Sequence, residues 1–168
     1  MKKCLKHSTI SYFVFRKSYF LLILPILTLT FAHLLAVESP ALPKIQMTTH
    51  EQVASGLQLP LMEAFYTIQG EGRFSGHAAY FIRLGGCDVG CVWCDVKESW
   101  EAGKWPTVSI EELVAGAFSY PGRLVVITGG EPLLYNLNPL TQLLKSNGFA
   151  VHLETSGAHP FSGQFDWV

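Results

Sequence analysis

The stretch that organises this chain is Arg123-Leu124-Val125-Val126-Ile127-Thr128-Gly129-Gly130-Glu131-Pro132. Its apolar run is typical of a strand buried on both faces, and the two glycines predict where that strand ends. Similar runs cover residues 79–84, which precede Gly85 and Gly86, and residues 150–154. Residues 165–168 are expected to begin a fourth strand.

Two helices are predicted between these strands. Ser109 followed by Glu112 forms a capping-box pattern ahead of an apolar stripe. Asn138 and Pro139 predict the N-cap and first residue of a second helix, which should end at residues 147–148. The order β-α-β-α-β predicts an α/β fold with parallel strands and right-handed crossovers. Residues 38–58 show no sustained periodicity and are expected to form a linker.

In parallel sheets, functional loops follow the carboxyl ends of the strands. The three predicted strand ends carry the unusual clusters of this chain, which are residues 85–87, 128–132 and 154–157. We therefore expect these loops to meet at one edge of the sheet and to form the functional site.

Charge divides the 168 residues into two chemically different parts. Residues 1–46 contain six Lys or Arg and one acid, whereas residues 47–168 contain six Lys or Arg and twelve acids. The larger part carries no basic patch, so nucleic-acid binding is not expected. We predict a domain over residues 47–168, preceded by a separate extension over residues 1–46.

Residues 18–37 form an uncharged apolar run long enough to cross a bilayer. Basic residues lie upstream of it, as in a signal or membrane anchor. However, the basic region is long for a signal peptide, and Pro25 and His33 interrupt the run. Three interpretations stay open: a start codon assigned too far upstream, an anchor or export segment, and an unusual tail.

Three of the four cysteines, Cys87, Cys91 and Cys94, lie in a C-x3-C-x2-C segment. Three thiols on one short loop are poorly placed for disulfides. A structural zinc site normally has four ligands, and the nearest further candidate, His77, precedes the strand. A [4Fe-4S] cluster held by three thiolates keeps one iron open for a ligand, so this segment favours such a cluster.

The cysteine segment, followed by Asp95, and the segment Gly129-Gly130-Glu131-Pro132 resemble the signature of radical S-adenosylmethionine enzymes. Residues 63–72, 74–76 and 81–87 narrow the resemblance to 7-carboxy-7-deazaguanine synthases. The resemblance implies a partial (β/α) TIM-like barrel with parallel strands. It also implies that an open iron binds S-adenosylmethionine, which one electron cleaves to a 5′-deoxyadenosyl radical.

That family converts 6-carboxy-5,6,7,8-tetrahydropterin to 7-carboxy-7-deazaguanine with loss of ammonia, in queuosine biosynthesis. The resemblance also implies a homodimer and a reductant such as flavodoxin or ferredoxin. Because oxidising compartments favour disulfides, a reduced cluster implies a cytoplasmic location and disfavours export through residues 18–37.

The resemblance also implies roles for individual residues. It places cluster ligation on Cys87, Cys91 and Cys94. The residues implied to contact S-adenosylmethionine are Trp93, Cys94, Asp95, Gly129, Gly130, Glu131, Thr155, Ser156 and Gly157. Those implied to contact the pterin are Ile68, Gln69, Gly70, Arg83 and Thr128.

The family often uses Mg²⁺ near the substrate carboxylate, with a hydroxyl-bearing residue after the aspartate as a ligand. Here that position is Val96, so substrate oxygens and water would have to hold the ion. The family match stops at residues 165–168, where a family member would continue, so a truncated product is expected. The alternatives are a glycyl-radical enzyme activase and a metal-binding module anchored in a membrane through residues 18–37.

Overall fold

The computed structural model describes residues 47–168. The predictions for residues 1–46, including the apolar run at residues 18–37, lie outside the described residues. Within the described part of the chain, the helices are too short or too polar to cross a bilayer.

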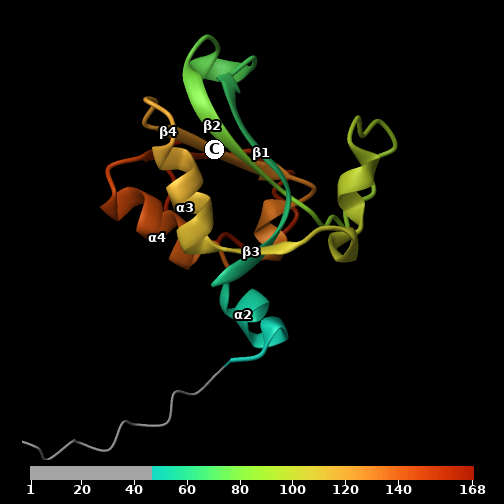
Figure 1. The fold of residues 1–168 in the computed structure, drawn as a ribbon. Helices are drawn as coiled ribbons and strands as arrows, with labels where there is room; N and C mark the ends of the chain where they lie inside the picture. The colour runs from blue at the N-terminus through green and yellow to red at the C-terminus, as the bar shows by residue number, and fades with distance from the viewer. Residues whose placement is uncertain (1–46) are drawn as a thin grey trace, which may run out of the picture. The chain divides into compact units, whose positions relative to one another are not determined.

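A mixed sheet of five strands, in the order β3-β1-β2-β4-β5, organises the described residues (Figure 1). The strands are β1 (Gln58–Ile68), β2 (Ala78–Leu84), β3 (Thr107–Ser109), β4 (Leu124–Gly129) and β5 (Ala150–Leu153). The helices are α2 (Thr49–Ser55), α3 (Ile110–Phe118) and α4 (Asn138–Ser146), and four 3-10 turns are η1 (Gly72–Phe74), η2 (Lys97–Trp100), η3 (Ala102–Lys104) and η4 (Pro132–Leu134).

Strands β2, β4 and β5 are parallel, as the order of predicted elements requires. The sequence did not predict β1 and β3, which add antiparallel pairs to the same sheet. The predicted fourth strand over residues 165–168 is wrong. Only a single parallel bridge forms there, between His152 and Trp167.

Side chains of the parallel strands alternate between two faces, as strand geometry demands. Ile82, Ile127 and Leu153 belong to the main hydrophobic core, together with side chains of α3 and α4. Phe81 and Val126 point the other way and form a smaller cluster with Ala79. Helices α3 and α4 thus cover one face of the sheet, and the opposite face carries this smaller apolar cluster together with polar side chains near the strand ends.

Both predicted helices form, with small differences at their starts. The Ser109 hydroxyl accepts from the Glu112 backbone N–H at 3.2 Å, which is one half of the predicted capping box. The prediction that Asn138 is an N-cap is wrong by one residue, because the N-cap is Leu137. The Asn136 side chain accepts from the Asn138 N–H at 3.2 Å and takes the capping role.

Of the linker predicted over residues 38–58, the structure describes residues 47–58, and there the prediction is wrong. Residues 49–55 form α2, whose N-cap Thr48 exchanges hydrogen bonds with Glu51 in a complete capping box. The Thr-x-x-Glu pattern is a local signal that could have predicted this helix.

Candidate active site

The cysteine loop, which we define as residues 87–98, leaves the sheet directly after β2. Its base is closed by two backbone bonds, from the Gly86 N–H to Ser99 at 2.6 Å and from the Cys87 N–H to Trp100 at 3.1 Å. Cys87, Cys91 and Cys94 are free thiols, each partly exposed. The loop therefore carries three partly exposed cysteines on a base that backbone hydrogen bonds fix.

Gly129, the last residue of β4, and Gly130, which follows it, lie against the end of β2 and the base of this loop. A Cβ atom on Gly130 would lie 2.2 Å from the Gly86 carbonyl oxygen and 2.9 Å from Cys87 Cβ. Gly129 has a φ of 144°, and a Cβ atom on it would lie 2.2 Å from the Leu84 carbonyl oxygen. Glycine is thus needed here for strand-end packing, independently of any contact to a ligand.

A cleft of about 390 Å³ opens on the sheet face away from α3 and α4. It brings together four of the five predicted substrate residues and three of the predicted cofactor or cluster residues. Its lining residues are Phe65, Thr67, Gln69, Gly70, Glu71, Phe81, Arg83, Cys94, Asp95, Val96, Thr128, Gly129 and Glu154.

The fifth predicted substrate residue, Ile68, does not line this cleft. Along β1, Phe65 and Thr67 line the cleft, so strand alternation directs Ile68 to the other side. Its side chain is 56% exposed. The cleft thus brings together the other four predicted substrate residues but not Ile68.

Gln69 connects the β1–β2 hairpin to the far side of the cleft. Its Nε2 donates to Glu154 Oε1 at 2.9 Å, and its Oε1 accepts from the Glu71 N–H at 3.1 Å. These bonds leave the amide with one N–H and one lone pair for a ligand. Gln69 is also buried, so its orientation is fixed.

Arg83 lies on β2 opposite Glu63 of β1. The Arg83 Nε atom is 2.7 Å from Glu63 Oε1, but its N–H is not aligned for a hydrogen bond, so the contact is an ion pair. This contact involves one edge of the guanidinium and leaves the two terminal nitrogens to pair with a carboxylate. Ile82 and Leu84 point into the core, as predicted.

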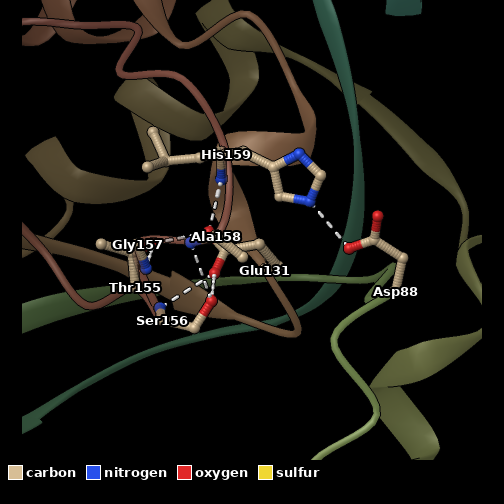
Figure 2. A network of polar contacts seen from close by, with 8 residues as sticks. Asp88, Glu131, Thr155, Ser156, Gly157, Ala158 and His159 are labelled. Atoms are coloured by element: carbon tan, nitrogen blue, oxygen red, sulfur yellow. Dashed lines mark hydrogen bonds and ion pairs between the residues drawn. The ribbon is translucent and has the colours of Figure 1, made fainter.

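Glu131 is 1% exposed and receives four hydrogen bonds (Figure 2). Leu133 N–H and the Thr155 hydroxyl donate to Oε1 at 2.9 and 2.6 Å. The Ser156 N–H and hydroxyl donate to Oε2 at 2.9 and 2.5 Å. The predicted contact of Glu131 with a cofactor ammonium would require one of these bonds to break.

Burial alone would raise the pKa of Glu131, but the hydrogen bonds from Ser156, Thr155 and Leu133 outweigh burial and lower it. The carboxylate is therefore the stable form of this buried side chain at neutral pH.

The remaining predicted cofactor residues surround the cleft without lining it. Trp93 is 83% exposed at the outer end of the cysteine loop. Thr155, Ser156 and Gly157 follow β5, and His159 Nε2 lies 2.8 Å from Asp88 Oδ1 of the cysteine loop. The loops after β2, β4 and β5 are thus joined by side-chain contacts, as the sequence predicted for one sheet edge.

The donor set fits an iron–sulfur cluster. Three free thiols are soft ligands that suit iron–sulfur chemistry. Among residues 47–168, no three His, Cys, Asp or Glu side chains converge on a single metal-ion position. A cubane cluster has no such requirement, because each thiolate binds a different iron.

The profile of the Radical SAM superfamily matches residues 81–164, which is half of the chain. The chain therefore belongs to the radical SAM superfamily, whose members use a [4Fe-4S] cluster and S-adenosylmethionine.

Among named proteins, the chain is similar to 7-carboxy-7-deazaguanine synthases. It is 56% identical over 115 residues to that of Flavobacterium psychrophilum, covering 68% of this chain and 54% of the relative. It is 53% identical over 109 residues to that of Synechocystis sp., covering 65% and 52%. The chain thus spans about half the length of the curated relatives it matches.

A solved structure, QueE from Escherichia coli, matches the fold with a TM-score of 0.61 and 42% identity. The match covers 71% of this chain and 61% of that chain. The partial TIM-like radical SAM architecture expected from the sequence is therefore confirmed.

Sequence reasoning missed several cleft residues. Phe65 and Thr67 line the cleft from β1, which the sequence did not predict. Phe81 lies two residues before Arg83 on the predicted strand β2, so strand alternation was an available signal for it. Glu154 was expected within the strand-end cluster of residues 154–157, but no ligand contact was predicted for it. Its position directly before Thr155 at a strand end was the available signal.

Proposed function

We propose that this chain is the cofactor-binding and partial substrate-binding region of a 7-carboxy-7-deazaguanine synthase. The substrate, 6-carboxy-5,6,7,8-tetrahydropterin, and the product, 7-carboxy-7-deazaguanine, differ by one molecule of ammonia. The observation that carries this proposal is the cleft in which Cys94 of the cysteine loop lies beside Gln69, Arg83 and Thr128. Identity of 56% to a named synthase supports the same assignment.

In this proposal Cys87, Cys91 and Cys94 ligate the cluster. When bound, the cluster and S-adenosylmethionine supply a carbon-centred radical that removes a hydrogen atom from the substrate. The backbone of residues 93–95 and of Gly129 and Gly130 contacts S-adenosylmethionine. Thr155, Ser156 and Gly157 complete its binding site from the loop after β5.

The chain's own side chains bind and orient the pterin. The terminal nitrogens of Arg83 pair with its carboxylate, because a planar guanidinium matches two carboxylate oxygens. The free N–H and lone pair of Gln69 match the donor and acceptor edge of a pterin ring. The Thr128 hydroxyl, which is nearly buried at the end of β4, adds one further polar contact. Gly70 allows backbone approach because nothing lies within 4 Å of its Cβ position.

Further features belong to the same proposal. Mg²⁺ is held through substrate oxygens and water, because Val96 offers no side-chain oxygen. Flavodoxin or ferredoxin supplies the electron, and two copies form a homodimer. The protein works in the cytoplasm, where thiols stay reduced. Residues 47–168 act as the radical SAM domain, separate from residues 1–46.

Anaerobic reconstitution of the full chain tests this function. We expect about four irons per chain and a brown protein. With S-adenosylmethionine, a reductant and the pterin, mass spectrometry should detect 5′-deoxyadenosine and 7-carboxy-7-deazaguanine. A Cys94→Ala variant should yield neither, whereas Glu111→Gln, on the exposed side of α3, should match the parent. A colourless protein with stoichiometric zinc would refute the proposal.

A further inference from the structure

The loop that follows β5, residues 154–159, is exposed except for partly buried Thr155 and His159. Beneath it lies the Glu131 side chain, which is 1% exposed (Figure 2). A buried carboxylate under an exposed loop costs free energy unless it is fully hydrogen-bonded. Its four bonds meet that requirement, because an ionised carboxylate has about four lone-pair sites.

Three of the four donors to this carboxylate come from Thr155 and Ser156. A carboxylate only accepts, so both hydroxyls must donate to it and turn lone pairs toward the rest of the loop. Those oxygens accept from the Gly157 N–H at 3.0 Å and from the Ala158 N–H at 3.3 Å. The Glu131 carboxylate therefore fixes the direction in which both hydroxyls donate, and through them it orders residues 155–158. We call this chain of hydrogen bonds, from the amides of residues 157 and 158 through the two hydroxyls to Glu131, the relay.

The other end of this loop is attached to the cysteine loop, through the contact between His159 and Asp88. A change in the conformation of residues 155–158 would therefore also move the attachment of the cysteine loop. Gly157 has a φ of 72°, which side-chain-bearing residues rarely adopt, so the relay holds a backbone shape that needs glycine.

We propose that Glu131 is a positioning residue that shapes residues 155–158 through its carboxylate, and that it does not contact the cofactor through its side chain. The proposal rests on the proposed function in one respect, because the proposed function places this loop beside S-adenosylmethionine. The geometry of the relay itself requires neither cluster nor cofactor, so it can be tested without them.

Glu131→Gln keeps the shape of the side chain but replaces one acceptor oxygen with an NH₂ donor. In either orientation, the NH₂ group faces a backbone N–H, that of Leu133 or that of Ser156, and one of these bonds is lost. The matched control is Glu111→Gln, the same change on an exposed helical position.

Per-residue amide exchange is measured by NMR on the full chain, reduced and without iron or S-adenosylmethionine. We expect Glu131→Gln to accelerate exchange at Gly157 and Ala158 by about tenfold or more, and likewise at Leu133 or Ser156, whichever amide then faces the NH₂ group, since charge-assisted bonds to a buried acceptor are lost. Exchange at Val126, in the centre of β4, should stay unchanged in both variants. Exchange at Leu133, Ser156, Gly157 and Ala158 all within about twofold of the parent would overturn the proposal.

Two milder variants keep the proposal testable if Glu131→Gln does not fold. Thr155→Val should accelerate exchange at Gly157 but not at Ser156, whose N–H still reaches Glu131. Ser156→Ala should accelerate exchange at Ala158 but not at Gly157. Equal acceleration of all loop amides in both variants would contradict the relay.

Reconstituted protein supplies the functional arm. Glu131→Gln should raise the KM for S-adenosylmethionine about fivefold or more and leave the KM for the pterin unchanged, since only the cofactor loop is altered. Equal changes in both constants would contradict a role confined to this loop. If the parent forms no 7-carboxy-7-deazaguanine, the proposed function fails, and the exchange result still decides the role of Glu131.

Discussion

Substituting Gly130 with alanine should move the base of the cysteine loop. The new Cβ would lie 2.2 Å from the Gly86 carbonyl oxygen, 2.7 Å from its carbonyl carbon and 2.9 Å from Cys87 Cβ. Two of these three atoms are backbone, so no side-chain rotation can relieve the contact. The β2 end and the β4 end must therefore separate.

The size of the effect follows from two opposing contributions. Overpacking at a tightly packed position typically costs about 1–3 kcal/mol. Alanine in place of glycine, where the backbone allows it, stabilises by about 0.4–1 kcal/mol through the unfolded state. Gly103 provides the matched control, since its φ is ordinary and nothing lies within 4 Å of its Cβ position. We expect Gly130→Ala to be about 2 kcal/mol less stable than Gly103→Ala.

Thermal unfolding followed by circular dichroism measures this difference. For a domain of this size, about 2 kcal/mol corresponds to a Tm roughly 6–10 °C lower. Iron bound per folded chain should also fall in Gly130→Ala, because Cys87 is displaced. If the two alanine variants unfold at the same temperature and bind equal iron, then Gly130 does not position the cysteine loop.

Three further changes have expected outcomes. The pKa of Asp166 is lowered by hydrogen bonds from Lys145 and the Val151 N–H, so its contribution to stability is complete above pH about 4 and is lost as pH falls through the folded pKa. At pH 7 the free energy of unfolding of Asp166→Asn should therefore be about 0.5–1 kcal/mol lower than that of the parent, and it should decrease less as the pH is lowered. The Tyr135 hydroxyl donates to the Gly85 carbonyl at 2.7 Å, and burial raises the pKa of this phenol. Tyr135→Phe should cost about 1 kcal/mol in urea unfolding at pH 7 and reduce the loss of stability above pH 10. Arg83→Gln should raise the KM for the pterin about tenfold or more without changing that for S-adenosylmethionine, and equal effects on both would contradict its assigned role.

Local signals in the sequence predicted those elements whose stability is also local. The apolar runs of β2, β4 and β5, the Ser109 cap of α3 and the approximate start of α4 depend on neighbouring residues, so they were visible without a structure. Strand β1 was missed because Pro60 and its polar side chains break the expected alternation.

Sequence motifs predicted most of the candidate site residues. Contacts between residues that are far apart in the sequence were missed. The contact of Gln69 with Glu154 joins residues 85 positions apart, and no local pattern encodes it. The requirement for glycine at positions 129 and 130 was expected to come from a ligand, but close packing against the end of β2 already imposes it. The four-donor environment of Glu131 likewise depends on tertiary placement of the loop after β5.

Electron paramagnetic resonance of the reduced, reconstituted chain, with and without S-adenosylmethionine, tests most directly whether three cysteines leave one iron open. We expect a [4Fe-4S] signal whose shape changes when S-adenosylmethionine is added, and which is lost in Cys94→Ala. A signal that S-adenosylmethionine does not alter, or a chain that binds zinc in place of iron, would contradict this assignment.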